Sequence, residues 1–246
     1  MYKGKKVVVV MPAYNAAKTL QKTLEEVEKQ LVDEVVLVDD HSKDNTAELA
    51  KELGIEHVIR HDNNKGYGGN QKTCYNRALE IGGDIIIMVH PDYQYTPLLI
   101  PAMTSIIGND LFPVVFGSRI LGKGALRGGM PIYKYIANRI LTFFQNLLMN
   151  EKLGEYHTGY RAYSREVLES IDYNKLSDDF IFDNQIIAQI FNKKYQIGEI
   201  TCPTKYFPEA SSINIRRSSI YGLGVIGVSI RYFLHKSGLL KWTLLN

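Results

Sequence analysis

The chain has 246 residues, of which 45% are hydrophobic and 22% charged, and its formal net charge at pH 7 is +3. This composition is ordinary for a globular protein with a sizeable core, and it excludes a disordered chain. The two cysteines, Cys74 and Cys202, are too few for a disulfide framework and lack metal-ligand spacing, which favours a reducing compartment. The apolar run at residues 7–11 is too short for a signal peptide, so we expect a cytoplasmic protein.

The first hundred residues alternate between strand-like and helix-like segments. Residues 7–11 form a valine-rich run typical of a strand buried on both faces. The segments that follow predict a helix at 20–31, a strand at 34–38, a helix at 44–53, a strand at 57–60, a helix at 65–79 and a strand at 84–89. This alternation predicts an α/β fold with a mostly parallel sheet, whose ligands bind beyond the carboxyl ends of the strands.

The second half of the chain is less regular. It predicts a strand ending at 116–119, an amphipathic helix at 132–149, a helix at 181–191 and a strand at 196–202. The apolar stretch at 220–230 is about half the ~20 residues that a membrane-spanning helix needs. It is too short to cross a bilayer, and a membrane-interfacial helix, a dimer-forming helix and a core helix remain open.

Polar side chains gather after the predicted strands. They are Pro12, Tyr14 and Asn15 after the first strand, Asp39 and Asp40 after the second, and His90, Asp92 and Gln94 after the fourth. Because the carboxyl ends of parallel strands meet at one edge of a sheet, we expect these side chains to share a site. A turn at each strand end explains any one cluster, but it explains the three together poorly. Asp92 and Gln94 can reach one divalent ion through oxygen ligands.

Two stretches of the sequence contain basic but no acidic residues. The first lies between Asp110 and Glu151, and the second follows Glu209. They contain Arg119, Lys123, Arg127, Lys134 and Arg139, and Arg216, Arg217, Arg231, Lys236 and Lys241, respectively. This distribution indicates local anionic partners such as phosphates or a lipid surface, and solvated helical faces are the alternative. Nucleic acid is disfavoured because no recognisable reading module accompanies the charges.

These motifs resemble those of the inverting family 2 glycosyltransferases. The resemblance rests on the turn from Pro12 to Asn15, the Asp39–Asp40 pair with Asn45 and Thr46, the glycine turn at 64–68 and the Asp92/Gln94 strand end. Gly117 to Arg119 and residues 157–165 look like the branch of dolichyl- and polyprenyl-phosphate mannose and glucose synthases. The resemblance covers about residues 5–215 of the 246.

The resemblance implies a Rossmann-like sheet of the glycosyltransferase A type that binds a nucleotide-diphosphate sugar, with C-terminal helices. It implies metal-dependent transfer of a hexose from UDP- or GDP-hexose to a dolichyl or undecaprenyl phosphate. We expect a catalytic domain at 1–212 and a helical segment at 213–246 that contacts the membrane periphery or forms a homo-oligomer. The alternatives are a hydroxyl acceptor in cell-surface glycan synthesis and a non-catalytic nucleotide-sugar-binding protein.

The resemblance also implies roles for single residues on the donor side. Pro12, Tyr14, Asn15, Asp39 and Asp40 would bind the nucleoside, with Asp39 accepting from a base N–H. Lys65 and Gly66, at a helix start, would offer a positive charge and free N–H groups to the donor. A plain strand-ending turn and an ordinary glycine turn are the respective alternatives.

Asp92 and Gln94 would hold Mg²⁺ or Mn²⁺. The motif of the family is usually Asp-x-Asp, and this chain has His90 in the first position. A neutral imidazole binds Mn²⁺ better than it binds Mg²⁺, so we expect weaker metal binding or a preference for Mn²⁺. In the alternative, His90 is a structural residue.

On the acceptor side, the resemblance implies that Arg119 binds phosphate oxygens of the lipid, since a guanidinium does so bidentately. Lys134 and Arg139 would assist, and Thr158, Gly159 and Arg161 would shape the acceptor side. A surface ion pair is the alternative for Arg119.

Asp183 occupies the region of the catalytic base in the family. A hydroxyl acceptor requires a base, whereas a phosphomonoester is already ionised. We therefore expect Asp183 to bind the sugar or metal region, or to act as base for a hydroxyl acceptor. A helix N-cap is the alternative.

Overall fold

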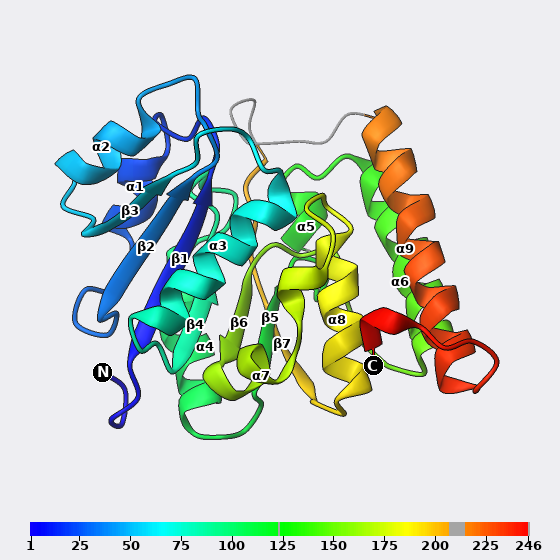
Figure 1. Cartoon of the computed structure of the whole chain (residues 1–246). Coiled ribbons are helices and arrows are strands. Elements are labelled where there is room, and N and C mark those ends of the chain that lie inside the picture. The colour runs from blue at the N-terminus through cyan, green and yellow to red at the C-terminus, as the bar shows by residue number, and fades with distance from the viewer. Residues whose placement is uncertain (123, 207–214, 246) are drawn as a thin grey trace.

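A seven-stranded sheet forms the centre of the molecule, with helices on both faces (Figure 1). The computed structural model describes residues 1–122, 124–206 and 215–245, without the side chains of residues 215–217. The strands are β1 (Val7–Ala13), β2 (Glu34–Asp39), β3 (His57–Arg60), β4 (Ile85–Met88), β5 (Val114–Ser118), β6 (Arg161–Ser164) and β7 (Ile197–Thr201). Their order is β3-β2-β1-β4-β6-β5-β7, and β6 alone among the described strands runs antiparallel to its two neighbours. The predicted mostly parallel sheet is confirmed.

Alternating side chains of β1 point into two separate cores. Val8 and Val10 belong to one core, whereas Val7, Val9 and Met11 belong to the other. This is the two-residue period of a strand that is covered on both faces. The valine-rich run therefore belongs to an inner strand of the sheet, between β2 and β4.

The helices form two layers. They are α1 (Leu20–Glu25), α2 (Thr46–Glu52), α3 (Tyr67–Glu80), α4 (Ile100–Gly108), α5 (Gly124–Arg127), α6 (Ile132–Met149), α7 (Arg165–Ser170), α8 (Phe182–Asn192) and α9 (Ile215–Lys236). Side chains of α1, α2 and α4 fill one core, and side chains of α3, α7, α8 and α9 fill the other. The predicted helix at 132–149 coincides with α6, while β6, α4 and α7 were not predicted.

The helices α6 and α9 lie side by side at one end of the molecule (Figure 1). The C-terminal segment also joins the main core, because Val228, Tyr232 and Trp242 are buried in it. No helix in the described ranges has the length and hydropathy that a bilayer crossing requires. The predicted roles of Lys123 and of the Arg216 and Arg217 side chains lie outside what the structure describes.

Candidate active site

A large cavity opens at the carboxyl edge of the parallel strands. Its volume is about 1060 Å³, and it extends from the ends of β1, β2 and β4 to the helices α6 and α9. The predicted site residues that line it are Pro12, Tyr14, Asn15, Asp40, Gly66, His90, Asp92, Gln94, Arg119, Lys134, Gly159 and Asp183. The structure therefore brings together most of the side chains that the sequence indicated. Asp39, Lys65, Arg139, Thr158 and Arg161 are not part of the lining.

The turn after β1 joins the turn after β2. Asn15 adopts a left-handed backbone conformation with a φ of 52°, which its short polar side chain tolerates. Its N–H donates to Ser42 Oγ at 2.8 Å, and its Oδ1 accepts from the Lys43 N–H at 2.8 Å. Tyr14, half exposed, and Pro12 remain on the cavity surface. Asn15 thus orders the turn that presents these two side chains.

Asp39 requires a correction. Its side chain is fully buried, and its carboxylate accepts hydrogen bonds from the backbone N–H and the hydroxyl of Ser42. Arg60 Nε lies 3.4 Å from the same carboxylate. Because these groups occupy its oxygens below the cavity surface, Asp39 does not line the predicted nucleoside pocket and instead holds the turn after β2.

Asp40 organises the neighbouring loop. Its carboxylate accepts from the N–H groups of Lys65 (2.8 Å) and Gly66 (3.0 Å), and it also contacts His61 Nδ1 at 2.7 Å. The prediction that Lys65 and Gly66 offer free N–H groups to the donor is therefore wrong. The Lys65 side chain is exposed and outside the cavity lining. An acidic residue of the chain itself occupies the place predicted for a phosphate.

The first turn of α3 is also closed by the protein. The N–H groups of Gly68 and Gly69 donate to the backbone carbonyl of Asp178, at 2.7 and 3.2 Å. Gly66 has a φ of 86°, and a Cβ placed on it would lie 2.7 Å from the same carbonyl oxygen. Only glycine satisfies both conditions. The glycine turn is therefore a close packing contact between α3 and the segment before α8.

Tyr67 connects His90 to Asp183. The Tyr67 hydroxyl donates to Asp183 Oδ2 at 3.0 Å and lies 3.4 Å from His90 Nε2, and its ring stacks on that of His90. Burial lowers the pKa of His90, and the neighbouring Asp92 and Asp183 charges oppose this shift without cancelling it. A neutral imidazole therefore stands at the position where the motif usually has a carboxylate.

Asp183 is not a helix N-cap. It lies in the first turn of α8, but its oxygens accept from Tyr67 and from Gln71 Nε2 at 3.1 Å, and not from its own helix. Arg161, which is fully buried, lies 3.2 Å from Asp183 through Nη2 and also donates to three backbone carbonyls. The N-cap alternative is therefore wrong, and Arg161 and Thr158 are buried below the cavity surface.

The Asp92–Gln94 turn is suited to oxygen ligation of a cation. The Gln94 N–H donates to Asp92 Oδ1 at 3.0 Å, and Tyr93 between them has a φ of 57°, an uncommon conformation that is often found at functional sites. Both flanking side chains are half buried and line the cavity. One carboxylate and one amide, completed by phosphate oxygens and water, match the ligands that Mg²⁺ and Mn²⁺ accept. The residues fit such an ion.

Among the described residues, one group of three acidic or imidazole side chains is close enough to hold a metal without further ligands. It consists of Glu34, Glu56 and His57, and it lies outside the cavity. His57 contacts Glu34 at 3.4 Å, and Lys6 lies 3.5 Å from the same carboxylate. The Lys6 ammonium therefore already balances part of the negative charge of this cluster.

Arg119 forms a buried ion pair that the sequence analysis missed. Nε and Nη2 both donate to Glu155 Oε1, Nη2 also donates to the His157 carbonyl at 2.7 Å, and Nη1 donates to the Tyr206 hydroxyl at 3.2 Å. Of the five guanidinium hydrogens, these contacts leave one, on Nη1, in the described part of the chain. The guanidinium therefore lacks the two free N–H groups that the predicted bidentate phosphate contact needs.

Glu155 remains charged beside this guanidinium. Burial raises the pKa of Glu155, but the Arg119 charge and hydrogen bonds outweigh burial and lower it overall. Asn138 Nδ2 donates to the same carboxylate at 2.9 Å. A signal for Glu155 existed, since a buried arginine in an acid-free stretch needs a carboxylate from elsewhere in the chain. Arg139 does not assist at the cavity, because it is exposed and donates to the Gly154 carbonyl.

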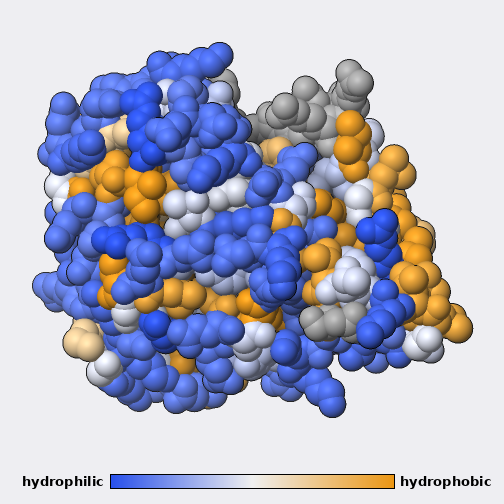
Figure 2. Space-filling model, in the orientation of Figure 1, coloured by the Kyte–Doolittle hydropathy of each residue, from blue (hydrophilic) through white to orange (hydrophobic). Residues whose placement is uncertain are grey.

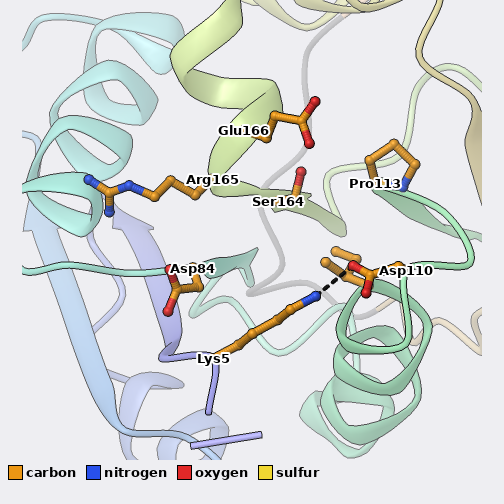
Figure 3. Close-up of a pocket in the computed structure, with 8 residues that line it drawn as sticks. Lys5, Asp84, Asp110, Pro113, Ser164, Arg165 and Glu166 are labelled. Atoms are coloured by element: carbon orange, nitrogen blue, oxygen red, sulfur yellow. Dashed lines mark hydrogen bonds and ion pairs between the residues drawn. The ribbon is translucent and has the colours of Figure 1, made fainter. Parts of the chain in front are cut away.

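A second hollow, of about 340 Å³, lies at the opposite edge of the sheet (Figure 3). Lys5 Nζ is 2.6 Å from Asp110, and the Asp84 carboxylate accepts from the Lys6 N–H at 2.7 Å. Arg165 donates to the Gly83 carbonyl at 3.0 Å. These charges are paired within the protein, so the hollow is a joint between the amino ends of the strands.

The seven-stranded sheet with helices on both faces is the A-type fold of glycosyltransferases. The chain belongs to glycosyl transferase family 2, whose family model matches residues 8–172. The resemblance stated from the sequence, the fold class and the enzyme class are therefore confirmed.

Two curated relatives illustrate the family. The chain is 29% identical over 218 residues to the UDP-N-acetylglucosamine–dolichyl-phosphate N-acetylglucosaminyltransferase of Methanococcus voltae, covering 82% of this chain and 86% of the relative. It is 28% identical over 212 residues to the low-salt glycan biosynthesis hexosyltransferase of Haloferax volcanii, covering 84% of this chain and 49% of the relative. The name of the first relative agrees with the polyprenyl-phosphate branch.

A solved structure shares the fold. It is the glucosyl-3-phosphoglycerate synthase of Mycobacterium tuberculosis in complex with Mn²⁺, uridine diphosphate and glucosyl-3-phosphoglycerate. The TM-score is 0.68 at 17% sequence identity, with 97% of this chain and 82% of that chain covered. The same synthase is also solved with Mg²⁺ and uridine diphosphate.

Proposed function

We propose that this protein transfers a hexose-type sugar from a uridine-diphosphate sugar to a polyprenyl phosphate, with inversion at the anomeric carbon. The observation that carries the proposal is the extent of one cavity. It joins the Asp92–Gln94 turn at the sheet edge to Arg119, Lys134 and the helices α6 and α9. A donor and an acceptor with a phosphate head and an apolar chain therefore fit the same space. The dolichyl-phosphate relative and the uridine diphosphate of the solved synthase support this choice.

The reaction is a single displacement. An oxygen of the acceptor phosphate forms a bond to the anomeric carbon while the bond from that carbon to the donor diphosphate breaks, and the diphosphate leaves with the electron pair. Asp92 and Gln94 would hold Mn²⁺ or Mg²⁺, which when bound neutralises diphosphate charge. The ion would be bound at the rim of the cavity by Asp92, Gln94 and His90. The nucleoside would be held by Pro12, Tyr14 and Asn15.

A phosphate acceptor requires no catalytic base, and Asp183 is consistent with this. Tyr67, Gln71 and Arg161 already surround its carboxylate, which leaves few of its roughly four lone-pair sites for an acceptor hydroxyl. We propose that Asp183 contacts the sugar while its carboxylate stays beside Arg161. A hydroxyl acceptor with Asp183 as base is the second candidate.

An apolar face beside the cavity supports a lipid acceptor (Figure 2). The α6–α9 face consists of Ile132, Tyr133, Ile136, Ile140, Phe143, Phe144 and Leu147 of α6 and Ile220, Leu223, Ile230 and Phe233 of α9, all exposed. Arg139, Arg231 and Lys236 are exposed on the same two helices. Large apolar patches mark interaction surfaces, and basic flanks favour anionic lipid. The sequence assigned membrane contact to residues 213–246. We propose instead that the whole α6–α9 face rests on the cytoplasmic membrane surface.

Two aromatic residues of the C-terminal segment do not belong to this surface. Tyr232 and Trp242 are both buried in the main core. Their rings hold α9 and the C-terminal segment against α8 and are not available to lipid.

The proposed function is tested with the purified chain, a panel of UDP- and GDP-sugars, Mn²⁺, and either undecaprenyl phosphate or soluble sugars as acceptors. We expect uridine diphosphate to be released only when the lipid phosphate is present. The other product should be an acid-labile lipid-phosphate sugar. Transfer to a sugar hydroxyl that is lost in Asp183→Asn, with donor binding intact, would favour the second candidate. Donor binding without transfer or hydrolysis would indicate a non-catalytic protein.

A further inference from the structure

A chain of buried hydrogen bonds ends at a histidine of the cavity wall. Gln145 Nε2 of α6 donates to Asn184 Oδ1 of α8 at 2.9 Å, and Asn184 Nδ2 donates to the hydroxyl of Tyr221 on α9 at 2.9 Å. That hydroxyl lies 2.8 Å from His157 Nδ1. His157 and Tyr221 both line the cavity. Three helices thus converge on one imidazole.

The direction of this chain determines the tautomer of His157. Tyr221 oxygen accepts from the Asn184 amide, so its own hydrogen is donated to His157 Nδ1. Burial lowers the pKa of His157 to about 4, against a smaller opposing effect of Glu155, so the ring is neutral near pH 7. A neutral ring that accepts at Nδ1 has its proton on Nε2.

The Nε2 atom of His157 has no hydrogen-bond partner among the described residues. It is buried, although His157 is one of the residues that line the cavity. Buried donors without a partner are rare in folded proteins, and each one calls for an explanation. A ligand acceptor atom in the cavity provides one.

The surroundings indicate an anionic partner. The Arg119 guanidinium, with one uncommitted hydrogen on Nη1 in the described part of the chain, donates to the His157 backbone carbonyl. Lys134 of α6 lines the same cavity. The cavity lining therefore combines two cationic side chains with His157.

We propose that His157 binds the phosphate group of the acceptor by donating a hydrogen bond from Nε2, beside Arg119. Tyr221, Asn184 and Gln145 are positioning residues that keep the proton on Nε2. The inference rests on the proposed function and extends it to a chemical class, a phosphomonoester on an apolar chain. It also assigns a role to the polar residue that α9 contributes to the site.

The kinetic test compares His157→Leu, which removes the donor, with the matched His157→Gln, whose amide retains an N–H near the position of Nε2. With undecaprenyl phosphate in detergent, we expect His157→Leu to raise the KM for the acceptor at least tenfold and to change the KM for the UDP-sugar by less than twofold. His157→Gln should restore most of the acceptor affinity. Thermal melting and UDP binding confirm that each variant is folded.

Three results would contradict the inference in distinguishable ways. An unchanged acceptor KM in His157→Leu, or an equal rise of the donor and acceptor KM values, overturns the role of His157 and leaves the proposed function standing. Wild-type protein that binds UDP-sugar but transfers nothing to undecaprenyl phosphate overturns both. Competition by inorganic phosphate as strong as that by a short prenyl phosphate shows a site for free phosphate and overturns the lipid assignment.

A spectroscopic test does not depend on turnover. In protein labelled with ¹⁵N-histidine, we expect the His157 signals of the Nε2–H tautomer at pH 7 and a shift of the Nε2 resonance when a short prenyl phosphate is added. Tyr221→Phe should weaken the tautomer preference, because the donor to Nδ1 is lost. An Nδ1–H tautomer in the wild type, or no shift with saturating prenyl phosphate, would contradict the proposal.

Discussion

At the residue scale, the cavity depends on two buried ion pairs that join segments far apart in the sequence. Arg119 with Glu155 connects the end of β5 to the loop before β6, and Arg161 with Asp183 connects β6 to α8. Buried charges are stable only when they are paired and hydrogen-bonded, and both pairs also have backbone partners. These pairs therefore hold the loop before β6 and the start of α8 in one arrangement.

Removal of one partner should be costly. We expect Arg161→Met to lower the free energy of unfolding by about 3–5 kcal/mol, because Asp183 would remain as a buried charge without its cation. Urea denaturation of the purified variant measures this change. Arg161→Met combined with Asp183→Asn should recover part of the loss, since the second change removes the uncompensated charge. A double variant that is no more stable than the single one would contradict this explanation.

The buried histidine predicts a pH effect. The pKa of His157 is about 4 in the folded protein and 6.5 for the free side chain, so the unfolded chain binds more protons in this range. The stability from the neutral ring is complete above pH 6.5 and is lost as the pH falls from 6.5 towards 4. We expect the unfolding free energy of His157→Gln to fall less than that of the wild type over this range. Parallel stability curves for the two proteins would contradict the shift.

At the scale of the elements, the glycine turn before α3 packs closely against the backbone of Asp178. Gly66→Ala should cost more than the ~1–3 kcal/mol of a strained backbone residue, because Gly66 has a φ of 86° with a ψ of 170° and its Cβ would also meet the Asp178 carbonyl. Gly82→Ala is the matched control, since Gly82 has a similar φ of 81° and nothing within 4 Å of its Cβ position. Urea denaturation compares the two variants. Equal losses of stability would show that the contact with Asp178 is unimportant.

The elements also show what sequence reasoning can and cannot deliver. Strong periodic signals gave β1 and α6, because burial on both faces of a sheet and on one face of a helix leaves a regular apolar pattern. β6 was missed because it is four residues long and begins with the charged Arg161, whose partner Asp183 lies 22 positions away. A strand held by such a distant contact has no local signature.

The same reasoning applies to the site. The rim residues after β1, β2 and β4 were predicted, since each follows a recognisable strand and the topology unites them. The internal hydrogen bonds of Asp39, Lys65 and Gly66 were not predicted, because sequence spacing does not show that Ser42 and Asp40 are their partners. Internal hydrogen-bond partners are a property of the three-dimensional structure alone.

At the scale of the whole molecule, α6 and α9 contribute residues both to the cavity lining and to the exposed apolar α6–α9 face. We expect Phe143→Ser with Leu147→Ser, at residues 63% and 65% exposed, to reduce flotation with vesicles of phosphatidylglycerol. UDP binding should be unchanged. Leu98→Ser with Leu111→Ser is the matched control, because these residues are 66% and 64% exposed but lie away from the face.

The outcome separates two uses of this surface. A larger loss of flotation in the α6 variant than in the control supports membrane contact. A dimer in solution that the α6 variant dissociates, with no vesicle binding by the wild type, would show that the face joins two copies of the chain.

The reversed direction of β6 has a consequence for how such enzymes diversify. Because β6 runs opposite to β4 and β5, the loop that precedes it, residues 156–160, reaches the same edge as the loops that follow the parallel strands. The turns after β1, β2 and β4 come from the first hundred residues, whereas His157 and Arg119 come from later ones. Recombination that exchanges residues 119–160 between relatives should therefore alter the choice of acceptor while the donor half is inherited intact.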